Sequence, residues 1–234
     1  MIQNATINLL NKYKHQFHPV VPFTTNPIRI FPLNLSATNK TLTPEIYNDI
    51  HFFRSYIDTH LEMHHCQYAI GGYNEWRDIY SSSSLFDGLA SPRRLHLGVD
   101  VWGHVGTPIY AFMGGMVHSF AFNNRLGDYG ATLILSHQLD SISFYTLYGH
   151  IALNDISILQ PGNYVSRGNI IAHIGAPEEN GNWPPHLHFQ IITNIELYEG
   201  DYPGVCSKEE AEKYLFNCPD PELILNLKSH VINI

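Results

Sequence analysis

The sequence predicts a mainly β protein, α+β overall, in which an antiparallel sheet follows a helical N-terminal extension and precedes a short helical tail. Three observations predict this class: a helical apolar period early in the chain, short β-branched and aromatic runs between glycine turns in the middle, and helix-start signals near the end. The predicted segments are 1–84 for the N-terminal arm and helical extension, 85–198 for the β domain and 199–234 for the tail.

Residues 1–42 are rich in Asn, Thr and Pro, with prolines at positions 19, 22, 27 and 32 among aromatic and aliphatic residues. Proline removes a backbone donor and cannot continue a helix interior. We therefore predict an extended arm or edge strand here rather than a helix.

A helix is predicted to begin at Thr43. Threonine is a favourable N-cap, and Pro44 suits the first helical position because its fixed φ is already helical. Apolar residues then recur at three- and four-residue steps, as one face of a helix requires: Ile46, Ile50, Phe53, Ile57 and Leu61. The serine run 81–84 predicts a loop after this helix.

The central region has the composition of a sheet. Its short runs of β-branched and aromatic residues are separated by glycine turns, and they lie at Ile109–Ala111, Met116–Phe122, Ala131–Ser136, Ser143–Leu147 and His188–Ile192. A further pair of short strands is predicted between Tyr164 and Gly175, hinged near Gly168. The sequence Asp128-Tyr129-Gly130 is typical of a β-turn that leads into the next strand.

Helix signals return in the tail. Ser207 and Glu210 have the spacing of a capping box, in which the side chains of the first and fourth residues cap the start of a helix. Pro221 is placed to open a final helical turn.

Composition restricts the class of partner and the compartment. With 234 residues, 44% of them apolar, the chain can bury a sizeable core, whereas a net charge of −8 with only 13 Lys and Arg gives no basic surface for nucleic acid. No apolar window approaches a membrane span, and no export signal is visible, which predicts a cytoplasmic protein, or a periplasmic or secreted one if a leader has been removed. The three cysteines predict buried or bystander thiols, and whether Cys206 pairs with Cys218 is left open.

Five residues in three short contexts point to a metal site: His96, Asp100, His150, His186 and His188. Their spacings alone carry little weight, because a chain with 15 histidines contains about one His-x-His pair by chance. The flanks carry more. The other histidines, including His64 and His65 near the end of the predicted helix, are interpreted as structural or surface groups or left unassigned.

Strand geometry explains why these flanks matter. On a straight strand His96 and Asp100 would stand roughly 13 Å apart, so the chain must bend between them, and Gly98 has the freedom for that bend. His186 and His188 are two apart and face the same side of a strand, while the residue between them enters the core.

The residue types predict catalytic zinc. Two imidazoles and one carboxylate leave a fourth tetrahedral position for water, as in catalytic rather than structural zinc sites. Two further imidazoles near that water can take its proton, orient it and stabilise the charge that develops on a polarised carbonyl.

The contexts also resemble a known family. Arg94 to Thr193 is similar to the LytM and lysostaphin zinc endopeptidases in the order and flanks of three motifs, which here read His96-Leu97-Gly98-Val99-Asp100, Tyr148-Gly149-His150 and His186-Leu187-His188. The resemblance implies a small β domain with an open groove, one zinc per chain bound by His96, Asp100 and His188, and His150 and His186 as catalytic partners. Family members cut peptide bonds in bacterial cell-wall peptidoglycan, often beside glycine or D-alanine.

Two segments set this chain apart within that resemblance. Asn182-Trp183-Pro184 stands where many members have a hydroxyl residue and glycine, so the groove wall is expected to differ. The stretches 180–185 and 200–205 resemble a subgroup in which the module is fused between phosphotransferase-like and class III aminotransferase domains.

Three functions therefore compete at this stage. The first is a zinc metallopeptidase acting on a peptide-like substrate, the second a zinc-containing module that binds a peptide or metabolite without efficient turnover, and the third an enzyme with the same metal site and a non-peptide substrate. The presence of all five residues favours the first. The N-terminal arm can complete the fold, form a dimer contact or cover the groove, where an asparagine would supply the fourth zinc ligand.

Overall fold

The computed structural model of the chain describes residues 2–87 and 91–233. Its α-helices are α1 Ile2–Tyr13, α2 Pro44–Tyr47, α3 Ile50–Met63, α4 Ser84–Asp87, α5 Leu153–Ile156, α6 Ala211–Asn217 and α7 Glu222–Leu225. Short 3-10 helices lie at Lys14–Gln16, Asp78–Ser82, Pro177–Glu179 and Lys228–His230. The strands are β1 Ile30–Leu33, β2 Tyr68–Gly71, β3 Glu75–Trp76, β4 Arg93–His96, β5 Val99–Trp102, β6 Pro108–Tyr110, β7 Gly115–Asn123, β8 Gly130–Leu139, β9 Ile142–Ile151, β10 Tyr164–Val165, β11 Ile170–His173, β12 His186–Ile192 and β13 Val205–Ser207.

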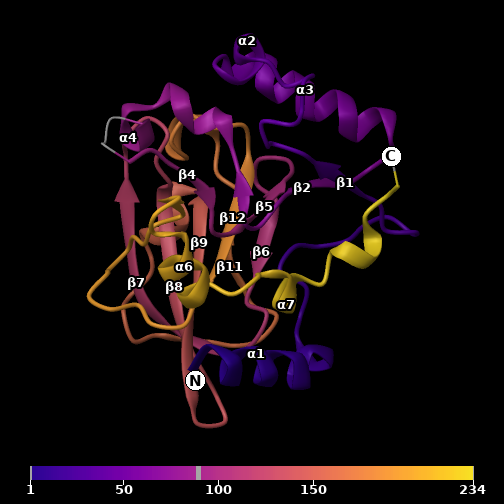
Figure 1. Cartoon of the computed structure of the whole chain (residues 1–234). Coiled ribbons are helices and arrows are strands. Elements are labelled where there is room, and N and C mark those ends of the chain that lie inside the picture. The colour runs from indigo at the N-terminus through magenta and orange to yellow at the C-terminus, as the bar shows by residue number, and fades with distance from the viewer. Residues whose placement is uncertain (1, 88–90, 234) are drawn as a thin grey trace.

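One large sheet organises the fold. Its eight strands run in the order β1-β2-β5-β12-β9-β8-β7-β10, and all neighbours are antiparallel except β1 and β2. A two-stranded sheet (β11-β6) and a three-stranded sheet (β13-β4-β3) complete the described strands. The fold is mainly β with an antiparallel sheet, as predicted (Figure 1).

The predicted strands are present. The five β-rich runs correspond to β6, β7, β8, β9 and β12, although β6 ends one residue before the first run does. Two short strands, β10 and β11, flank Gly168. These two do not pair with each other, because β10 pairs with β7 and β11 with β6.

The prediction for the first residues was wrong. Residues 2–13 form helix α1 rather than an extended arm. The prolines begin only at Pro19, so nothing in this stretch blocks a helix, and Thr6 and Leu10 are buried on one face. Figure 1 shows α1 at the opposite end of the molecule from α2 and α3, and Tyr13 donates a hydrogen bond to Asp140 in the β8–β9 turn. The later part of the arm does form an edge strand, β1.

The predicted helix from Thr43 is present but divided. α2 begins at Pro44 after Thr43, and a second helix, α3, begins after Asp49. The Asp49 carboxylate accepts hydrogen bonds from the backbone N–H groups of His51 and Phe52, which caps α3. The apolar period continues across the break because α3 buries Phe53, Ile57 and Leu61. The predicted loop at 81–84 was wrong, since a 3-10 helix ends at residue 82 and α4 begins at residue 84.

The tail is helical, with one correction. Ser207 ends strand β13, and its hydroxyl donates to the Glu210 side chain instead of capping a helix, so the predicted capping box is absent. α6 begins at Ala211, and α7 begins directly after Pro221 as predicted. Cys206 and Cys218 are buried as free thiols and are not paired.

Three apolar clusters hold these elements together. The largest fills the space around the main sheet and includes Val101, Leu187 and Phe189, each buried beside a candidate site residue. A second joins α3 to β1 and β2 through Phe53 and Ile57. Among the described helices, none combines the length and apolar character that crossing a membrane requires.

Candidate metal centre

The topology of the sheet brings the candidate ligands together. β12 lies between β5 and β9, and in its register His188 stands opposite Asp100 on one side and Gly149 on the other. Residues directly opposite in an antiparallel pair share a face of the sheet, so His188 and Asp100 are neighbours. The chain bends as predicted, because β4 ends at His96 and β5 begins at Val99.

Gly98 has a different role from the predicted one. Its backbone is not in the left-handed region, but a Cβ at this position would lie 2.5 Å from the His188 ring. Glycine is therefore needed because the ligand ring passes directly over the backbone.

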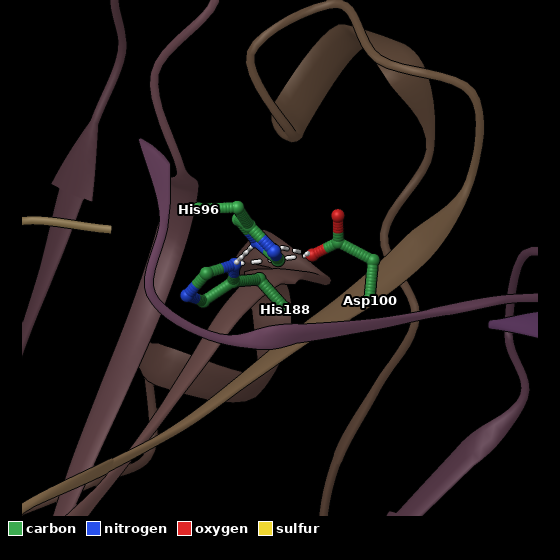
Figure 2. A group of neighbouring side chains, drawn as sticks. All are labelled: His96, Asp100 and His188. Atoms are coloured by element: carbon green, nitrogen blue, oxygen red, sulfur yellow. Dashed lines mark hydrogen bonds and ion pairs between the residues drawn. The ribbon is translucent and has the colours of Figure 1, made fainter. Parts of the chain in front are cut away.

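Three donor atoms form a small, nearly equilateral triangle. His96 Nε2 lies 3.0 Å from His188 Nδ1 and 3.2 Å from Asp100 Oδ1, and His188 Nδ1 lies 3.1 Å from Asp100 Oδ1 (Figure 2). All three side chains are buried. A tetrahedral ion with bonds of about 2.05 Å separates its ligand atoms by about 3.3 Å, so the triangle has nearly the size that zinc requires.

The imidazole protons are directed away from the centre of this triangle. His96 Nδ1 donates to the Gly72 carbonyl at 2.8 Å, and His188 Nε2 donates to Gln190 Oε1 at 2.9 Å. Lone pairs of His96 Nε2, His188 Nδ1 and Asp100 Oδ1 then face one another at van der Waals distance or closer. Three acceptors in this arrangement repel unless a cation lies between them, and the donor set N, N and O fits zinc.

Asp100 is held as a carboxylate. Burial alone would raise its pKa, but the neighbouring His96, the Arg77 guanidinium and the adjacent His188 together hold the pKa of Asp100 well below its usual range. Arg77 Nη1 donates to Asp100 Oδ2 at 2.5 Å, which leaves Oδ1 for the triangle. The ligand is therefore charged and oriented at neutral pH.

His150 and His186 lie beside the triangle. Their ring centroids are 4.1 Å apart, and His186 Nε2 is 4.0 Å from Asp100 Oδ1. His186 stacks on Trp102 at 4.0 Å between ring centroids. His150 has φ 63°, an uncommon value for a residue with a side chain, and it lies where the pairing of β8 and β9 shifts register. This shift breaks the alternation of the strand and aims His150 at the same side as His188.

Both of these histidines are anchored in the same way. His150 Nδ1 donates to the Asn180 carbonyl and His186 Nδ1 to the Pro184 carbonyl, each at 2.8 Å. Burial lowers the pKa of His186 to about 4, and burial together with the neighbouring imidazoles lowers the pKa of His150 well below its usual value. Each ring is neutral, with Nε2 free to accept a proton.

A pocket of about 240 Å³ opens over the five residues. Trp183 lines it, as predicted for the altered groove wall, together with Tyr80 and Phe86 from before β4 and Tyr202 from after β12. No described residue of the stretch 2–42 lines this pocket. The alternative in which an asparagine of the arm supplies a fourth zinc ligand therefore has no support in the described part of the chain.

Sequence reasoning missed three side chains that contact this centre. Arg77 binds Asp100, Gln190 accepts from His188, and the Tyr129 hydroxyl lies 3.4 Å from His188 Nε2. Tyr129 was assigned only to a turn. Gln190 had a signal, because it is two residues beyond His188 on the same strand face. Arg77 had none, since no local pattern links it to Asp100.

A comparison with protein families identifies the segment that carries the ligands. Residues 94–199 match the model of Peptidase family M23. We call residues 94–199, which are similar to this family, the M23 segment. The match begins just before His96, ends after β12 and includes all five predicted site residues.

Curated relatives match the same region. The chain is 30% identical over 101 residues to the DD-carboxypeptidase/endopeptidase Mpg of Neisseria meningitidis serogroup B, covering 43% of this chain and 21% of that protein. It is 31% identical over 123 residues to the lipoprotein NlpD/LppB homolog of Pseudomonas aeruginosa, covering 53% and 36%. The chain therefore spans well under half the length of these relatives.

Solved structures match the chain at lower sequence identity. The catalytic domain of lysostaphin from Staphylococcus simulans matches with 24% identity and a TM-score of 0.36 over 51% of this chain and 80% of that one. A zinc-containing peptidase from Vibrio cholerae matches with 27% identity and a TM-score of 0.35 over 47% and 32%.

Proposed function

We propose that this protein is a zinc-dependent hydrolase that cleaves a peptide or amide bond in the pocket above His96, Asp100 and His188. The observation that carries the proposal is the triangle of three acceptor atoms 3.0–3.2 Å apart, with both imidazole protons committed elsewhere. Two further neutral imidazoles, His150 and His186, stand beside it.

The residues fit zinc and hydrolysis together. When bound, zinc supplies polarisation of the scissile carbonyl and acidification of water. His150 and His186 each present an unprotonated Nε2, because Nδ1 is held by a backbone carbonyl. One of the pair accepts the proton of the attacking water at Nε2 and returns it to the leaving nitrogen, while the Nε2 of the other accepts a hydrogen bond from that water and orients it.

The proposed substrate class is the peptide of the bacterial cell wall. The M23 match and the relative whose name describes a DD-carboxypeptidase and endopeptidase support this class. The aromatic walls formed by Tyr80, Phe86 and Trp183 suit the aliphatic parts of a short peptide. The cytoplasmic compartment and the fusion to phosphotransferase-like and aminotransferase domains stay predictions.

Two measurements test the proposal. Metal analysis of the purified protein is expected to find about one zinc per chain, the occupancy of a single catalytic site. Zinc-loaded protein incubated with cell-wall peptides that contain D-alanine or glycine linkages is expected to release fragments detectable by mass spectrometry. His150→Ala is the matched variant, expected to keep zinc and lose cleavage.

The outcome separates the competing functions. Zinc without cleavage across the panel would favour the module that binds a peptide or metabolite without turnover. Absence of zinc from protein purified without chelators, and failure to take it up afterwards, would contradict the metal centre itself.

A further inference from the structure

Arg77 lies directly behind the candidate metal centre. Its side chain is 1% exposed, and its guanidinium donates to the Asp100 carboxylate through Nη1 and to Glu75 Oε2 through Nε at 2.7 Å. Nη1 also donates to the Tyr80 hydroxyl at 3.1 Å, and Nη2 to the Gly72 carbonyl at 3.3 Å. The planar guanidinium is thus fixed from several sides.

The surrounding backbone leaves room for this group. A Cβ at Gly71 would lie 2.8 Å from Arg77 Nη2, so a larger residue there would shift the guanidinium from its present place. Gly72 serves both sides of the site, because its carbonyl accepts from Arg77 Nη2 and from His96 Nδ1. Arg77 and the ligand His96 therefore share one anchoring point.

A buried cation next to a cation site needs an explanation. By Coulomb's law alone, Arg77 disfavours a divalent ion at the triangle. Glu75 offsets part of that charge, and Arg77 occupies Oδ2 of Asp100 while Oδ1 faces His96 and His188. The contact therefore orients the Asp100 carboxylate: it prevents the group from rotating and from offering both oxygens to a metal ion.

We propose that Arg77 is a positioning residue for the metal centre, which holds Asp100 as a ligand through one oxygen only. This inference rests on the proposed zinc site. It also assigns a role to the segment before residue 94, where the M23 match begins, because the orienting group comes from outside the matched domain.

The test measures zinc affinity of the full chain by competition with a chelating dye. Arg77→Met is expected to weaken zinc binding about 10- to 100-fold, the range typical for partners that orient metal ligands. A purely electrostatic role predicts the opposite sign, because removing a cation would strengthen the binding of zinc. The direction of the change therefore separates the two interpretations.

Arg77→Lys guards against a folding defect. It keeps the buried charge beside Glu75 and Asp100 but lacks the planar fork, so we expect weaker zinc binding than wild type and tighter binding than Arg77→Met. If Arg77→Met does not fold, the affinity of the lysine variant decides the case. Wild-type affinity in the lysine variant would then overturn the proposal.

Cobalt replacing zinc gives a second readout that does not depend on activity. In Arg77→Met the freed carboxylate can bind through both oxygens, which raises the coordination number and weakens the visible absorption band of cobalt. An unchanged cobalt spectrum together with unchanged zinc affinity would overturn the role of Arg77.

Arg94→Met is the matched control. Arg94 also pairs with two carboxylates, Asp78 and Asp87, but neither is a candidate ligand. We expect its zinc affinity and cobalt spectrum to match those of wild type. Failure of the wild-type protein to bind zinc would instead contradict the proposed function, so the two failures are distinguishable.

Discussion

The metal centre draws on two regions of the molecule: the strands of the M23 segment, and the flanks, which are the segments before and after it. The strands supply His96, Asp100 and His188, whereas the groups that orient these ligands depend on the flanks. His96 donates to Gly72 and Asp100 accepts from Arg77, both before the matched domain.

The third ligand depends on the other flank. Gln190 accepts from His188, and its amide nitrogen is fixed by the Pro203 carbonyl at 3.1 Å and by Cys218 Sγ at 3.3 Å. Chemistry and orientation thus come from different parts of the chain. A ligand that lies on a rigid strand still needs a second partner to fix its proton and rotation, and here the flanks provide or hold that partner.

The largest effect is expected from removing Asp100, the ligand on β5 that also binds Arg77 of the N-terminal flank. Asp100→Ala is expected to abolish stoichiometric zinc and turnover. It also leaves the buried Arg77 without one of its two carboxylates, which is expected to cost about 3 kcal/mol of stability. Metal analysis and thermal unfolding measure both effects.

Two variants sharpen the interpretation of this result. His188→Ala is expected to lose zinc with a smaller loss of stability, because it strands no buried charge. Asp155→Ala removes a carboxylate that binds His173 within the M23 segment and is expected to keep zinc. Equal stability of the Asp100 and His188 variants would argue against a structural role for the Arg77–Asp100 pair.

The next effect separates metal binding from proton transfer. His150→Ala is expected to retain about one zinc per chain and to lose about 10²- to 10⁴-fold in kcat, the usual contribution of a general acid or base. Its anchor to the Asn180 carbonyl lies within the strands and loops of the M23 segment, so no flank contact is broken. His118→Ala, which removes a half-buried histidine from β7, is the control. Near-wild-type turnover in His150→Ala would remove His150 from the mechanism.

Sequence reasoning was most successful where the geometry is local. His186 and His188 face one side because of strand alternation, and the break near Gly98 followed from strand length. The contact between Arg77 and Asp100 could not be predicted from the sequence. The two residues are 23 positions apart and meet only because β2 pairs with β5.

Other features depended on tertiary context. The φ of 63° at His150 arises where two strands change register, and no composition signal marks it. The prediction missed α1 because the prolines that exclude a helix begin only at Pro19, whereas the prediction of an extended arm covers residues 1–42. The five residues that the sequence singles out lie together at one pocket, but their metal and catalytic roles, and the predicted boundaries at 84 and 198, stay predictions.

A smaller effect is expected in the strands alone: the free energy of unfolding should depend on pH through His137. Burial lowers the pKa of His137 on β8 to about 4 from 6.5, and it lies outside the metal triangle, bonded to Gly114 and Thr146. The unfolded chain binds a proton near pH 6.5 that the folded chain rejects until about pH 4, so this stabilisation is complete above pH 6.5 and is lost as the pH falls toward 4. Between pH 7 and pH 5 the loss is about 2 kcal/mol.

His137→Gln tests this sign. The variant is expected to be less stable at pH 7 because it disturbs two buried hydrogen bonds, but its stability should fall less steeply on acidification. Denaturant unfolding at several pH values measures the slope. An equal slope in variant and wild type would show that the acid sensitivity comes from other groups.

The smallest expected effect tests Gln190, the β12 residue whose amide is held by Pro203 and Cys218 of the C-terminal flank. In Gln190→Leu, His188 Nε2 loses its acceptor at 2.9 Å and keeps only the Tyr129 hydroxyl at 3.4 Å, so the ring is less firmly oriented. Zinc affinity is expected to fall about tenfold, the lower end of the range for such partners. The loss is smaller than for Arg77→Met because a second oxygen is within reach of His188, whereas no second cation contacts Asp100 Oδ2 among the hydrogen bonds and ion pairs described.

Gln138→Leu, on the exposed side of β8, is the control with the same change in side chain. A larger loss of zinc affinity in Gln190→Leu than in Arg77→Met would reverse this ranking and make Gln190, rather than Arg77, the main support of the metal ligands.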